Sequence, residues 1–163
     1  MGADSGLRET ALRIDGLELT IRRLLLALVA FGAVGLVPEL ILLKHYDSFW
    51  QIVPLAVLLL VLLTAGFVWR RPDPRTLAAF RAVMWLCVAA GVAGLVLHAK
   101  GNLEWALERD ESLRGWPLIW KILRGATPLL APGAMAQLGL LGLVFTYRHP
   151  ALARGPYPDP ETI

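Results

Sequence analysis

Four long apolar stretches alternate with polar segments along the chain. Each stretch is about twenty residues long and almost free of charge. A hydrocarbon core of about 30 Å needs roughly 20 helical residues to cross it, and a backbone in lipid must pair its polar groups internally. The pattern therefore predicts an all-α integral membrane protein with four transmembrane helices in an antiparallel up-down bundle. The spans are expected at residues 24–43, 49–69, 76–97 and 125–147.

The polar segments complete the predicted organisation. Residues 1–23 are expected to form a cytoplasmic N-terminal segment, and residues 98–124 an outer loop between the third and fourth spans. The proline-rich tail, residues 148–163, should be cytoplasmic, and extended from Pro150 onward.

The outer loop holds a short helical segment in this prediction. Asn102 is placed as the N-cap of a helix that runs to about Leu113, and Gly115 as its end. Trp116 and Trp120 then suit a segment that lies in the membrane interface, because indole rings favour headgroup depth.

Composition and charge narrow the class of protein. The apolar fraction is 56% and the charged fraction 18%, whereas a soluble domain carries about 25% charged residues. This excludes an ordinary water-soluble enzyme. The net charge of +3 comes from basic residues at the ends of the apolar stretches, so the sequence predicts no nucleic-acid partner.

The basic residues also predict an orientation. Ten of the 16 basic residues lie on the same side as the N-terminus in the four-span arrangement. Cytoplasmic segments carry the excess of Lys and Arg, so both termini are expected in the cytoplasm. The preference for Arg over Lys hints at a GC-rich bacterial genome, which makes the bacterial inner membrane the expected location.

A loose group of polar residues lies near the outer ends of the spans. Its members are Glu39, His45, Gln51, His98 and Glu104. An acidic residue within a span is a functional hypothesis by default, and imidazole and carboxyl groups can bind a quinone or pigment headgroup or ligate a metal. Their spacing matches no metal-binding motif, so we assign no metal ligands. The alternative interpretation is that these residues simply lie at the wet interface.

The polar and small residues inside the predicted spans indicate contacts between helices and no catalytic or cofactor site. None of the predicted span interiors contains histidine, so no transmembrane haem held by a histidine pair is expected. Gln137 and Thr64 are expected to form interhelical hydrogen bonds. Gly94 and Gly139 are expected to let helices approach closely.

Three functions remain open at this point. The favoured one is a non-catalytic accessory subunit of a larger bacterial membrane complex for respiratory or photosynthetic electron transfer. Its partners would be other membrane protein subunits, lipids or pigments. The alternative is an autonomous redox or metal- or quinone-binding protein with its site at Glu39, His45, His98 and Glu104. A small transporter with Glu39 and Gln137 along its path is the second alternative. The sequence itself identifies no cofactor.

Overall fold

The protein is helical throughout the part of the chain that is described. The computed structural model describes residues 2–125, 127 and 130–153, and all regular elements in these ranges are helices. The six helices are α1 (Gly2–Leu42), α2 (Phe49–Arg70), α3 (Pro74–Arg109), α4 (Gly115–Leu123), α5 (Leu130–Thr146) and α6 (Pro150–Ala153). The helices α1, α2 and α3 are long and apolar enough to cross a membrane. This confirms the predicted helical, membrane-spanning character of the chain.

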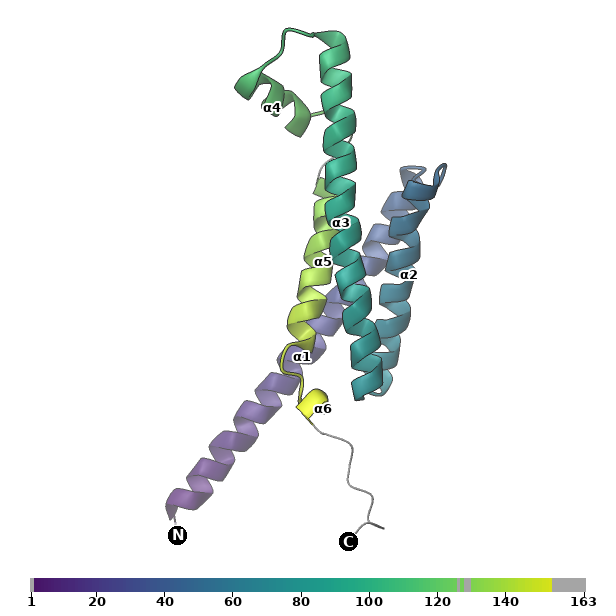
Figure 1. The fold of residues 1–163 in the computed structure, drawn as a ribbon. Coiled ribbons are helices and arrows are strands. Elements are labelled where there is room, and N and C mark those ends of the chain that lie inside the picture. Colours follow the sequence, from purple (N-terminus) through teal and green to yellow (C-terminus); the bar gives the residue numbers. More distant parts are fainter. Residues whose placement is uncertain (1, 126, 128–129, 154–163) are drawn as a thin grey trace.

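Four of the helices pack side by side. Helix α1 contacts α2 and α5, and helix α3 also contacts α2 and α5 (Figure 1). Apolar side chains that are almost fully buried fill the space between them, and Phe80 and Phe145 meet edge to face with ring centroids 5.6 Å apart. Helix α5, with 17 residues, is the shortest of the four.

The N-terminal segment is not separate from the first apolar stretch. Helix α1 runs without a break over 41 residues, which corresponds to about 60 Å at 1.5 Å per residue. An ion pair of 2.7 Å between Glu18 and Arg22, four residues apart, supports the helix where the sequence changes from polar to apolar. Figure 1 shows the N-terminal half of α1 projecting beyond the other helices.

The outer loop differs from the prediction at Asn102. Helix α3 continues through this residue to Arg109, so Asn102 does not cap a helix. Its buried side chain instead donates from Nδ2 to the carbonyl oxygens of Ile122 (3.0 Å) and Thr127 (2.9 Å). Its Oδ1 accepts from the backbone N and the hydroxyl of Thr127 (3.0 and 2.6 Å). Asn102 therefore ties α3 to the segment that leads into α5.

Two further expectations for the loop and tail were wrong. Gly115 begins helix α4 instead of ending a helix, and its φ of 60° lies in the region that favours glycine. Pro150 begins the one-turn helix α6 where an extended chain was expected. The Nδ1 atom of His149 accepts from the backbone N of Ala151 (3.2 Å), which satisfies a donor at the start of α6. The rest of the tail, residues 154–163, lies outside the described residues.

Glycines lie where α3 and α5 come closest. A Cβ atom built on Gly91 would lie 2.6 Å from the backbone N of Ala136. One built on Gly139 would lie 2.8 Å from the carbonyl oxygen of Met84, and one on Gly94 would lie 2.8 Å from Cβ of Pro132. Neither backbone can move away without disturbing a helix, so larger residues at Gly91 and Gly139 would force α3 and α5 apart.

The expected interhelical bonds of Gln137 and Thr64 are not formed in the described part of the chain. The hydroxyl of Thr64 donates to the carbonyl oxygen of Leu60 (2.7 Å) in its own helix. Gln137 is exposed on the outer side of α5. Since α5 is apolar all round, its sequence does not indicate which side faces outward.

Arg22 fastens α1 to the C-terminal end of α5 and the two residues that follow it. Its guanidinium donates to the carbonyl oxygens of Phe145 (2.7 Å), Tyr147 (3.2 Å) and Arg148 (3.1 Å). The last carbonyl groups of a helix lack partners within the helix and carry partial negative charge, so a cation stabilises them. The Arg22 side chain is only 13% exposed.

We expect Arg22→Ala to lower the free energy of unfolding by about 2–3 kcal/mol, because it leaves three carbonyl groups without a charged donor. The matched control is Arg23→Ala, which removes the neighbouring, exposed arginine. Circular dichroism during thermal or chemical unfolding in detergent would measure both. Equal losses in the two variants would show that charge alone, and not the contact with α5, matters at this position.

Candidate functional site

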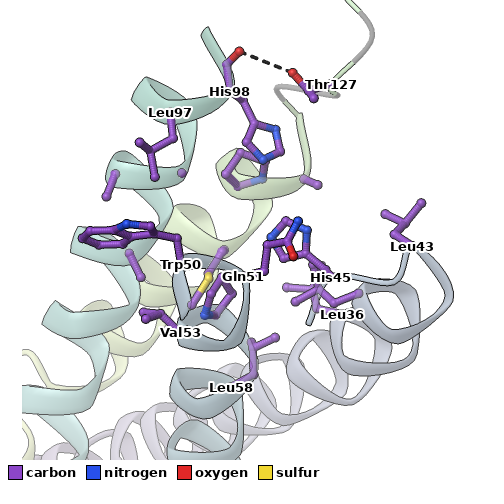
Figure 2. Close-up of a pocket in the computed structure, with 18 of the residues that line it drawn as sticks. Leu36, Leu43, His45, Trp50, Gln51, Val53, Leu58, Leu97, His98 and Thr127 are labelled. Carbon is purple, nitrogen blue, oxygen red and sulfur yellow. Dashed lines mark hydrogen bonds between the residues drawn. The ribbon is translucent and has the colours of Figure 1, made fainter. Parts of the chain in front are cut away.

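A cavity of about 490 Å³ lies among the four packed helices, at the end where α1 connects to α2 (Figure 2). Most of its lining is apolar and comes from the helix interiors, including Leu36, Leu58 and Met135. Polar side chains gather in the lining as well. They are Glu39, His45, Gln51, His98 and Thr127. The cavity thus combines a polar region near the helix ends with an apolar region deeper between the helices.

The connection between α1 and α2 positions two of these polar residues. After α1 ends, Lys44 has a φ of 52°, and the backbone N of His45 donates to the carbonyl oxygen of Leu40 (2.8 Å). This turn places His45 beside the bundle. The Oε1 atom of Gln51 accepts from the backbone N of Asp47 (2.9 Å) and of Ser48 (3.1 Å) at the start of α2. The Oε1 atom of Gln51 is thus used by the backbone, and its amide NH₂ is the group that can donate to a ligand.

His98 reaches the cavity from α3. The backbone carbonyl oxygen of His98 accepts a hydrogen bond from the hydroxyl of Thr127 (3.3 Å), which Figure 2 marks. The rings of His45 and His98 lie with their centroids 6.1 Å apart and their planes tilted by 54°. Two residues that are far apart in the sequence thus form one pair of imidazoles in the cavity lining.

The surroundings of His45 favour the uncharged form of its ring. Burial lowers the pKa of His45 below its ordinary value, and the positive charge of His98 lowers it further. A neutral imidazole offers one hydrogen-bond donor and one acceptor. At neutral pH, His45 therefore provides both functions to a bound molecule.

Four of the five residues that the sequence singled out line this cavity, and Glu104 does not. Glu104 lies further along α3 on an exposed surface, where its Oε1 is 3.6 Å from Nζ of Lys100. Because α3 continues as a helix beyond its apolar part, it carries Glu104 away from the cavity. Among the residues described, no group of three or more His, Cys, Asp or Glu side chains is arranged to hold a metal ion.

Several lining residues were not predicted from the sequence. Trp50 is one of them, and Figure 2 shows its indole beside the helical wall opposite His45. Its place next to the start of the second apolar stretch was a usable signal, since tryptophan favours the interface. Thr127 was missed because its position depends on the long-range bonds to Asn102. The apolar residues gave no signal, because they resemble all the others in the spans.

Comparison with protein-family models, with curated proteins and with solved structures gave no match to this chain. No residue role is therefore transferred from another protein. The geometry and chemistry of the cavity are the basis for the function proposed below.

We expect His98→Gln to raise the pKa of His45, because the substitution removes the neighbouring positive charge while burial remains. The pKa should stay below the ordinary imidazole value. NMR titration of labelled imidazoles in nanodiscs would measure it. His149 is the internal control, because its pKa is lowered by its own burial and by Arg22 at the other end of the bundle.

The same shift predicts the direction of the pH effect on stability. With a lowered pKa, native His45 binds fewer protons than the unfolded chain at pH values below about 6.5. Its contribution to stability is therefore present above that range and is lost as the pH falls through it. An unchanged His45 pKa in His98→Gln would contradict the coupling of the two rings.

Proposed function

We propose that the chain crosses the bacterial inner membrane four times, as an antiparallel up-down bundle with both termini in the cytoplasm. Helix α5, at 17 residues, extends about 26 Å and packs between α1 and α3. This length supports a fourth crossing close to the 30 Å core. The excess of basic residues on the side of the N-terminus supports the orientation. The cavity then lies toward the non-cytoplasmic surface, and α4 at that interface.

We propose further that the cavity binds a neutral amphipathic molecule of the membrane, of the isoprenoid quinone class. The observation that carries this proposal is the joining of a polar region to an apolar one within a single cavity. The carbonyl oxygens of a quinone accept hydrogen bonds, and neutral imidazole and the NH₂ of Gln51 donate them. The apolar region between the helices suits an isoprenoid chain.

The charges of the lining favour this class over an anionic phospholipid. Of the described residues that line the cavity, none is Lys or Arg, and Glu39 is acidic. A phosphate headgroup would meet a carboxyl group and a neutral imidazole in this environment, without a cationic partner. Burying a charged group without an opposite charge beside it costs free energy, and a quinone headgroup avoids this cost because it carries no charge.

A non-catalytic role in a larger electron-transfer complex fits a quinone-binding chain of this size. The outer surfaces of the helices are apolar, and Gln137 presents an amide on the outer side of α5. An amide without a hydrogen-bond partner is costly in hydrocarbon, so Gln137 favours a protein neighbour over lipid. A transport path has less support, because Glu39 lines the cavity while Gln137 points away from the bundle.

The ligand proposal is tested by binding of a short-chain quinone such as decylubiquinone to the purified chain in nanodiscs. We expect His45→Ala and His98→Ala each to weaken binding by about tenfold, the effect of one lost hydrogen bond. Glu104→Gln is the matched control outside the cavity and should bind like the natural chain. Binding that is equal in all variants, or retention of an anionic phospholipid in place of the quinone, would contradict the proposal.

The subunit role is tested by purification from the native host in mild detergent, followed by mass spectrometry. We expect other membrane proteins to co-purify in a fixed ratio, and Gln137→Leu to reduce that ratio. The matched control is Leu140→Ala, a nearby exposed position of α5 that carries no hydrogen-bonding group. A chain that purifies without other proteins, in the natural form, would contradict the role.

A further inference from the structure

The side of α1 that faces away from the bundle carries a regular apolar seam. Its residues alternate at spacings of three and four, and each is between 48% and 77% exposed. The seam consists of Ile14, Leu17, Ile21, Leu24, Leu28 and Phe31. An apolar residue every 3.5 positions on average is the pattern of a coiled coil, in which these residues occupy the a and d positions of a heptad. The first of them, Ile14, takes an a position.

The seam and the bundle use different sides of α1. On the bundle side of α1, the side chains of Leu26, Val29 and Ala33 are buried against the other helices. At 3.6 residues per turn, their mean direction differs from that of the seam by roughly 140°. A partner on the seam therefore would not compete with the contacts that hold α1 in the bundle.

Membrane lipid can cover only part of this exposed seam. Helix α1 is about 60 Å long, twice the thickness of the hydrocarbon core. Ile14 and Leu17, about three-fifths exposed, lie in its projecting half, beside which Figure 1 shows no other helix of the described part of the chain. Exposed apolar rows of this kind in an aqueous setting mark protein contacts.

We propose that the seam binds the same seam of a second copy, so that the protein is a homodimer joined by a parallel two-stranded coiled coil of α1. Ile at the a positions 14 and 21 with Leu at the d positions 17 and 24 is the combination that favours two parallel strands. Two copies inserted in the same orientation present their α1 helices in parallel across a two-fold axis normal to the membrane.

The charges beside the seam agree with this register. Arg13 occupies a g position and Glu18 the following e position. In a parallel, in-register pair, these are the positions that face each other across the two strands. The ion pair with Arg22 of its own chain holds the Glu18 carboxylate beside the seam. The next a position is Gly35, around which nothing lies within 4 Å of an added Cβ, so the two helices can come close there.

Disulfide cross-linking of the full chain in phosphatidylcholine vesicles tests the dimer. In Leu17→Cys the new thiols lie at a d position and should form a cross-linked dimer on mild oxidation. Leu19→Cys is the matched control, because Leu19 is similarly exposed but occupies the f position on the far side of the strand. The natural Cys87 is buried, so the unmodified chain provides the background. We expect about tenfold more cross-linked dimer in Leu17→Cys than in Leu19→Cys.

A second pair of variants tests the dimer without cross-linking. Single-molecule photobleaching in the same vesicles should show mostly two copies per spot for the natural chain and for Leu19→Asp, and single copies for Leu17→Asp. Equal cross-linking at the two positions, or a natural chain that is monomeric, would overturn the proposal. The result is independent of the quinone proposal, because the seam residues do not line the cavity and His45→Ala should remain dimeric.

Discussion

The bundle depends on polar side chains that hold α5 at both of its ends. Arg22 of α1 binds carbonyl groups at the C-terminal end of α5 and just beyond it, and Asn102 of α3 binds the segment that leads into α5. Between these two attachments, Gly91 and Gly139 allow the backbones of α3 and α5 to approach. In hydrocarbon, apolar side chains gain little by leaving lipid for one another, so helix contacts rely on close packing and hydrogen bonds. These attachments therefore decide where α5 lies.

The cavity follows from the position of α5. Met135 and Pro132 of α5 form one wall, while α1 and the α1–α2 connection supply the opposite side. The two histidines enter from α3 and from that connection, so they meet only when α1 and α3 are held at a fixed separation. Burial in this arrangement lowers the pKa of His45, and the nearby His98 lowers it further. One packing arrangement thus determines both the shape and the electrostatics of the cavity.

The sequence predicted the helical membrane character of the chain, because length and hydropathy carry that information. The polar residues near the ends of the predicted spans pointed to the end of the bundle where four of them line the cavity. It did not predict that α1 and α3 extend beyond the apolar stretches, since hydropathy falls where a helix leaves the membrane whether or not the helix ends. For the same reason Glu104 was grouped with the four polar residues that line the cavity. Asn102 was misplaced because an asparagine at a helix start and one that binds a distant loop look alike in sequence. The sequence also did not indicate that Gln137 faces outward, because the helix that carries it is apolar all round.

Helix α1 takes part in both proposed functions, through different regions. The heptad seam ends near Gly35, and the cavity begins with Leu36 and Glu39. Pro38 lies in the cavity-lining stretch and removes one hydrogen bond from the helix ladder. The interruption of the ladder therefore falls in the cavity-lining stretch and outside the seam. The proposed pairing of two copies and the proposed binding cavity are compatible within a single helix, because they use separate stretches of it.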